Sequence, residues 1–320
     1  SVFTGANLIE TDFSGIGTTI DADFQYIQST NSTFEDANLV GSIFFMSRMD
    51  AIRFDRANLE GVSFGGVDSL GLNFTAANVR NGGFFHGNLR GARFIDADVA
   101  GANYFGANLT GARFTGAIGG LDDVSGRSTS LHGVTAPFSN FDNATLDGAG
   151  LIDANMTDAS LAGASFSGSF GPGSRFVIAR MAGVNFTDAF LNHANFGGAN
   201  FGFDNDAGDF FNGLGPNFAR AQLVSAQFSG TALFGAIYDN AFAPGSDFSN
   251  ADFRADENGN PASFVNTDLT GSKLVRTQLP GANMSGARLY AADAREAFLG
   301  EAILDNVDAY GANFFVASFV

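Results

Sequence analysis

The sequence predicts an all-β solenoid, a chain wound into short stacked coils. Bulky apolar residues, mostly Phe and Leu, occupy every fifth position from Phe24 to Phe114, and only Ser29 and Ser69 interrupt the series. A small residue, usually Ala, stands two positions before most of these central residues, and Asn or Asp often stands one before, as in residues 57–59. A fixed internal period of this kind is typical of repeat architectures and not of a single globular core.

A period of five residues requires one turn in every pentad. In a straight strand, a residue and its fifth neighbour point to opposite faces, yet here both are apolar. In an α-helix the apolar positions would be spread around the axis. A turn in each pentad returns every central residue to the interior. The small residue two positions earlier has the same parity, so it also points inward, where crowding demands Ala, Ser, Thr or Gly.

This pattern resembles the pentapeptide-repeat family, whose motif is Ala-(Asp/Asn)-Leu/Phe-x-x, over most of the chain. The resemblance implies a right-handed quadrilateral β-helix in which four pentads form one square coil. The central residues also alternate in the first long block, with Phe or Tyr at every tenth position. This alternation independently indicates an even number of sides, with aromatic stacks on two opposite walls.

Interruptions of the period indicate where loops leave the coils. We expect one continuous β-helix over residues 1–320, because apolar central residues resume after each interruption. Projecting loops or distorted coils are expected at 116–137, 202–217 and 254–262. Loops on a rigid solenoid are common sites of recognition, although each can equally be a tolerated insertion.

The amino-acid composition limits the kinds of partner that the protein can bind. The net charge is −17 and the pI is about 4.3, which disfavours direct binding to nucleic acid or anionic membranes. No apolar run is long enough for a transmembrane helix, so we expect a soluble protein. Cysteine is absent, which excludes disulfides and thiolate metal sites. The localisation stays unknown. Ser1 is compatible with removal of a targeting segment for export or an organelle, and equally with a trimmed sequence.

No arrangement of residues predicts catalysis or a cofactor. His86, His132 and His193 lie far apart, and no phosphate-binding glycine motif is present. Two acidic segments are weak candidates for calcium loops, but neither has the complete pattern, so solvated turns are the preferred interpretation. The candidate ligands in the first segment are Asp204, Asp206 and Asp209, and those in the second are Asp256, Asn258 and Asn260.

Two surfaces are candidates for partner binding. On a four-sided coil, Arg53, Asn73, Arg93 and Arg113 fall one above another on one wall, which could bind an acidic partner or a headgroup. Alternatively, these arginines cover the wall with their stems and pair with nearby acids. The second candidate is the C-terminal end, where Phe314 and Phe315 lie in a segment with no capping helix, so self-association or docking is expected there.

The leading functional hypothesis is a non-enzymatic, acidic, rod-like scaffold or protein-interaction module, which could be a subunit of a larger assembly. The alternative is a DNA mimic that binds a type II topoisomerase such as gyrase, because some members of the family resemble duplex DNA in width and charge. Those relatives are typically shorter and dimerise through a C-terminal helix, which this sequence lacks. The stretch rich in arginine also interrupts the negative surface.

Overall fold

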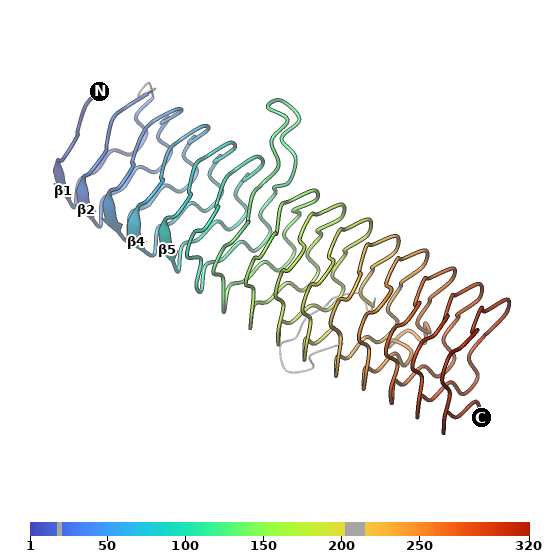
Figure 1. The fold of residues 1–320 in the computed structure, drawn as a ribbon. Coiled ribbons are helices and arrows are strands. Elements are labelled where there is room, and N and C mark those ends of the chain that lie inside the picture. Colours follow the sequence, from blue (N-terminus) through green and yellow to red (C-terminus); the bar gives the residue numbers. More distant parts are fainter. Residues whose placement is uncertain (18–20, 202–214) are drawn as a thin grey trace. The chain divides into compact units, whose positions relative to one another are not determined.

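The fold is built from very short parallel strands that repeat along the chain. A computed structural model describes residues 1–17, 21–201 and 215–320. Five strands form one parallel sheet in chain order (Figure 1). They are β1 (Asn7–Ile9), β2 (Gln28–Thr30), β3 (Arg48–Asp50), β4 (Asp68–Leu70) and β5 (Asn88–Arg90). Among the residues described, no helix has the length and apolar character needed to cross a membrane.

The pairing register shows four walls to each coil. From β2 to β5, each strand pairs with the segment four pentads further on, as in Gln28 with Arg48 and Asp68 with Asn88. Single bridges on the other three walls keep the same interval, for example Ile43 with Ser63, Arg53 with Asn73 and Asn58 with Asn78. The fold is therefore the right-handed quadrilateral β-helix that the sequence resemblance implied.

Each corner is formed by a residue with positive φ, two positions after a central residue. Gly61 has a φ of 65° and Arg56 a φ of 57°. Glycine and asparagine adopt this left-handed conformation most readily, whereas for a β-branched residue it is a genuine outlier. Ile178 nevertheless adopts it, with a φ of 59°. The turn predicted once per pentad is thus made at a single backbone position.

At many positions, the Asn or Asp side chain before a central residue closes the turn. Asn78 Oδ1 accepts a hydrogen bond of 3.1 Å from the backbone N–H of Arg80, and Asn108 Oδ1 does the same for Thr110. Such Asx turns satisfy an N–H group that the ladder leaves free. This explains why Asn and Asp recur at that position.

The chain divides into two compact units, residues 1–159 and 160–320. In the first unit two aromatic stacks fill the core. Phe64 and Phe84 stack with ring centroids 5.2 Å apart, and Phe74 and Phe94 with centroids 4.7 Å apart. The two stacks meet edge to face, as Phe84 and Phe94 do at 5.4 Å. The alternation of aromatic central residues is confirmed.

The second unit repeats this arrangement and then changes its filling. Phe218 stacks on Tyr238 at 5.0 Å, and Tyr238 stacks on Phe264 at 5.1 Å. After Phe264 the buried central residues become aliphatic, beginning with Leu269 and Leu274. The same backbone coil therefore accepts either filling.

The first coil is one residue longer than four pentads, since Val2 pairs with Asp23. Three larger interruptions occur where bridge partners lie further apart in the chain. Asn103 pairs with Ser130, and within this insertion Leu121 and Ser128 form an antiparallel bridge. Buried central residues resume at Leu131, two pentads before Phe141. The other two interruptions separate the bridge partners Asn185 and Asn217, and Ile237 and Ser263. Residues 202–214 lie outside the described part of the chain.

Candidate functional site

A hairpin of residues 121–128 projects from the wall of the first unit (Figure 1). Its stem is held by the carboxylate of Asp122, which is only 1% exposed. This carboxylate accepts hydrogen bonds from the Arg80 guanidinium, from Asn81 Nδ2 at 2.5 Å and from Ser125 Oγ at 2.8 Å. The Val124 N–H is a fourth donor, at 3.1 Å. Two of the four donors come from the wall, so the hairpin is anchored to the coils and not only to itself.

The anchoring carboxylate stays ionised at neutral pH. Hydrogen bonds from Asn81, Ser125 and the Val124 N–H, together with Arg80, hold the pKa of Asp122 well below its usual range. Donors that favour the charged form of a carboxyl group lower its pKa in this way. Arg80 is shared with Asp98, whose carboxylate lies 3.0 Å from Nη1. The hairpin is therefore attached through a network of charged hydrogen bonds.

The hairpin is exposed and carries both apolar and charged groups, with Val124 at its tip. Val124 is 90% exposed and Leu121 is 54% exposed. Asp123 and Arg127 are also exposed, and neither forms an ion pair with any residue that the structure describes. An ordered loop that presents unpartnered apolar side chains is a typical recognition element.

A groove of about 620 Å³ lies beside the hairpin on the same unit. Phe85 and Phe105 form its apolar side, and Arg127 and Ser128 at the base of the hairpin contribute to its lining. Gly65 makes room for this arrangement, because a Cβ atom at that position would clash with the Phe85 ring. The remaining lining residues are polar or small: Asn81, Gly83, Gly101, Asn103 and Ser130.

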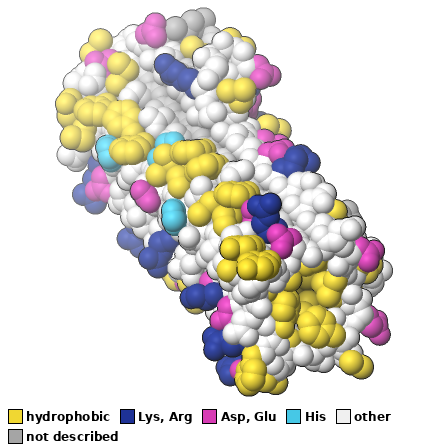
Figure 2. Space-filling model, turned by 45° about the vertical axis from the view of Figure 1, so that its right-hand side comes forward, with side chains coloured by type: hydrophobic (Ala, Val, Ile, Leu, Met, Phe, Trp, Pro, Cys, Tyr) yellow, Lys and Arg dark blue, Asp and Glu magenta, His cyan; other side chains and the backbone are white. Residues whose placement is uncertain are grey.

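Aromatic side chains continue from the groove along the corner of the coils. Phe45 and Phe85 lie with ring centroids 6.4 Å apart across Gly65, and the His86 ring lies 5.2 Å from that of Phe105. The ring centroids of Tyr26 and Phe45 also lie 6.4 Å apart. Figure 2 shows hydrophobic side chains gathered beside histidines on the face in view. Sequence reasoning missed this surface, although Phe45, Phe85 and Phe105 all directly follow a central residue.

The structure places the predicted arginines on one wall but in different environments. Bridges join Arg53 to Asn73, Asn73 to Arg93 and Arg93 to Arg113. Arg53 pairs with Glu35 and with Asp55, whose Oδ2 lies 3.3 Å from its Nε. Two carboxylates therefore already occupy its guanidinium.

Arg93 and Arg113 differ from Arg53, because neither forms an ion pair within the described residues. Arg90 lies on the neighbouring wall and is likewise exposed without an ion pair in that part of the chain. Gly91, with a φ of 66°, forms the corner between Arg90 and Arg93. We call Arg90, Arg93 and Arg113 the arginine corner. It is a cationic patch on an acidic protein.

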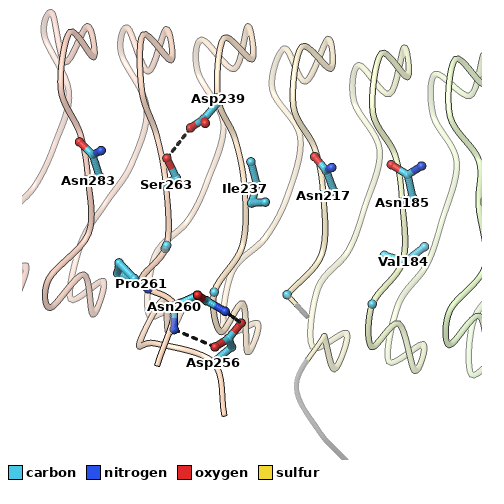
Figure 3. A pocket seen from close by; sticks show the side chains of 14 residues that line it. Val184, Asn185, Asn217, Ile237, Asp239, Asp256, Asn260, Pro261, Ser263 and Asn283 are labelled. Atoms are coloured by element: carbon cyan, nitrogen blue, oxygen red, sulfur yellow. Dashed lines mark hydrogen bonds between the residues drawn. The ribbon is translucent and has the colours of Figure 1, made fainter. Parts of the chain in front are cut away.

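The second unit contains another cavity of about 620 Å³ (Figure 3). Its carboxylates are already engaged: Asp239 Oδ1 accepts hydrogen bonds from Ser263 Oγ at 2.5 Å and from the Val265 N–H at 3.0 Å. Asp256 accepts bonds from the N–H of Asn260 at 2.8 Å and from its side-chain amide at 2.9 Å. These bonds close the loop at 254–262 on itself.

The remaining predicted residues are not brought together into a site. Asp204, Asp206 and Asp209 lie outside the described residues. Elsewhere in the described chain, no group of three His, Asp or Glu side chains is placed to hold a metal ion. The three histidines stay separate. His132 is half-buried, its Nδ1 accepts a hydrogen bond of 2.9 Å from the Ile152 N–H, and burial lowers its pKa.

The two C-terminal phenylalanines occupy different positions. Phe314 is a half-buried central residue whose ring lies 5.6 Å from that of Phe319. Phe315 is 71% exposed and points outward.

Comparison with known proteins identifies the repeat. The profile described as pentapeptide repeats matches the chain in eight copies, over residues 88–118, 138–170, 176–201, 262–297 and 282–319. No protein among the curated sequences matches the chain significantly.

Several solved structures are similar at low identity. HetL, a pentapeptide repeat protein involved in heterocyst differentiation regulation from the cyanobacterium Nostoc sp. strain PCC 7120, is 19% identical over 93% of this chain and 91% of its own, with a TM-score of 0.24. QnrB1, a plasmid-mediated fluoroquinolone resistance protein, is 19% identical over 62% of this chain and 86% of its own, with a TM-score of 0.31. A pentapeptide repeat protein from the Arabidopsis thaliana thylakoid lumen is 24% identical over 49% of this chain and 72% of its own, with a TM-score of 0.15. These similarities carry no argument about function. The profile matches and the coil register together give the conclusion that the chain belongs to the pentapeptide-repeat family.

Proposed function

We propose that the protein is a non-enzymatic scaffold that binds other proteins, and that the hairpin 121–128 with its adjacent groove is a principal contact surface. The observation that carries this proposal is the contrast within the hairpin. Asp122 anchors the stem to Arg80 and Asn81, while Val124 at the tip is 90% exposed. A partner that covers the tip recovers the free energy of apolar burial without having to order the loop first.

The arginine corner supports the same function through charge. Net repulsion from a chain of charge −17 disfavours large polyanions, whereas a protein with a small acidic segment needs only the local cations. Arg93 and Arg113 are adjacent in the ladder, at the strand spacing of about 4.8 Å. We propose this corner as a second contact surface, of which Arg53 is not a part because it is already paired.

Photo-crosslinking tests the proposal at single positions. A photoreactive amino acid replaces Val124 in one sample and Glu257, an exposed residue of the loop at 254–262, in a matched control. We expect position 124 to give a discrete adduct with a second polypeptide in the source cell, and position 257 to give none. Equal background from both positions would contradict the proposal.

The DNA-mimic hypothesis makes a different prediction. The acidic net charge favours it, whereas the exposed arginine corner opposes it, because a duplex presents no cations on its backbone. We expect no inhibition of gyrase supercoiling at micromolar protein. Inhibition that survives substitution of Val124 would favour the mimic over the interaction module proposed here.

A further inference from the structure

We infer that the groove of one copy of this chain receives the hairpin of a second copy. This inference rests on the proposed function and names its partner. Among the described residues, the groove and the hairpin present complementary chemistry on the same unit: an apolar side from Phe85 and Phe105, and a tip that offers Val124. The resulting association is reciprocal, because each copy supplies both parts.

Among the described residues, no side chain covers the apolar tip or the groove completely. Val124 is 90% exposed and Phe105 is 47% exposed, so the tip does not occupy the groove beside it. The anchoring of Asp122 to Arg80 and Asn81 keeps the hairpin in this projecting position. The hairpin of a second copy can bury Val124 and Leu121 against the Phe85 and Phe105 rings.

The charges of the hairpin favour a two-fold arrangement. Asp123 and Arg127 are both exposed, lie in the same hairpin and form no ion pair with each other or with the rest of the described chain. When two identical hairpins meet across a two-fold axis, Asp123 of each copy can face Arg127 of the other. A surface that carries both signs of charge is self-complementary under this symmetry, as an isologous interface requires.

The expected association is weak and reversible. A stable interface buries at least about 1,000 Å², and two hairpins with two grooves form a small contact. Two copies of charge −17 also repel each other. We therefore expect dimers that form in the micromolar range and dissociate on dilution.

Sedimentation equilibrium of the full chain tests the inference, with protein from about 1 to about 200 µM. The weight-average mass is expected to rise from 33.3 kDa towards twice that value. Asp123→Arg and Arg127→Asp should each weaken association at least about tenfold, because each places like charges opposite one another. The double variant restores opposite charges and should return the dissociation constant to within about threefold of the wild type.

Val124→Asp should also abolish the dimer, whereas Leu70→Asp is the matched control. Leu70 is an apolar residue of β4 that is 59% exposed and lies outside the hairpin and the groove, so its substitution should leave association unchanged. A wild-type chain that stays monomeric at every concentration would overturn the inference, as would a double variant no better than the single ones. If the chain is monomeric but position 124 crosslinks to a different protein, the self-association fails and the interaction function stands.

Discussion

Two loops interrupt the coils in the described chain, and each is built around one buried aspartate. Asp122 in the first unit accepts half of its side-chain hydrogen bonds from the wall, through Arg80 and Asn81, and half from its own hairpin. Asp256 in the second unit is 7% exposed and accepts bonds from Asn258 and Asn260 of its own loop. The first loop is thereby anchored and projects, whereas the second closes on itself.

This difference determines what each loop presents to solvent. The anchored hairpin exposes Leu121 and Val124. The loop at 254–262 exposes mainly polar and charged residues. Its Asp256 packs against Gly235 so closely that a Cβ atom on residue 235 would lie 2.8 Å from the Cβ atom of Asp256. Insertions of similar length on one fold can thus project for recognition or close over the surface. The two loops differ in whether the hydrogen-bond donors to their buried aspartate include residues of the wall.

The largest effect should come from the aromatic core beneath either loop. Phe84→Ala and Phe264→Ala each remove a fully buried ring that stacks on neighbours, so each should lower the free energy of unfolding by about 3–5 kcal/mol. Chemical denaturation measures this loss. Phe105→Ala is the exposed control, with an expected cost of about 1 kcal/mol. Near-wild-type stability of either buried variant would contradict the assignment of the stacks.

Neutralising either aspartate should open only the loop to which that aspartate belongs. Asp122→Asn removes the charge that binds Arg80, so tryptic cleavage after Arg127 should accelerate about tenfold. Asp256→Asn should leave that cleavage unchanged and should instead accelerate cleavage after Glu257 by a glutamate-specific protease, because the loop opens more often. If either substitution accelerated cleavage in both loops, the idea that each aspartate holds only its own loop would be wrong.

Acid should weaken the anchored hairpin in a defined direction. The folded pKa of Asp122 is lowered from the ordinary value of 3.8, so the open state binds protons more readily than the closed state. The anchoring is therefore complete above the ordinary pKa and is lost progressively as pH falls below about 4. Protection of the Gly126 amide against hydrogen exchange should be constant from pH 7 to 5 and decline below pH 4. Asp122→Asn should lack this decline.

The smallest effect on stability should come from removing two buried hydroxyl groups, one in each unit. Tyr104 and Tyr238 are fully buried, and their hydroxyls have no hydrogen-bond partner among the described residues. Burial raises the pKa of both phenols. Tyr104→Phe and Tyr238→Phe should each raise the free energy of unfolding by up to about 1 kcal/mol in denaturation experiments. A loss of that size would instead indicate a bound partner for the hydroxyl.

The fold was predictable because every pentad repeats the same physical constraint. The inward direction of Phe64 and Phe84 and the alternation of aromatic stacks depend only on residues within the period. The position at which the core resumes, Leu131, was not predicted. A single Leu followed by Ala136 is a weaker signal than the Phe141 from which the period was counted.

The candidate site was less predictable, because its contacts join distant positions. Asp122 meets Asn81, 41 residues earlier in the chain, and no local pattern links the two. The column of Arg53, Arg93 and Arg113 followed from the period, but the pairing of Arg53 with Glu35 depends on side-chain geometry across neighbouring coils. The exposed rings of Phe85 and Phe105 could have been found, since both directly follow a central residue.

Hydrogen exchange at neutral pH tests most directly whether the hairpin is an anchored recognition element. The N–H groups of Asp122, Gly126 and Thr129 donate to Arg127, Asp122 and Gly120. If the anchor holds, these amides should exchange at least about 100-fold more slowly than in unstructured peptides, and Asp122→Asn should remove that protection without affecting Phe84. Exchange of the wild-type hairpin at the rate of an unstructured peptide would contradict the account.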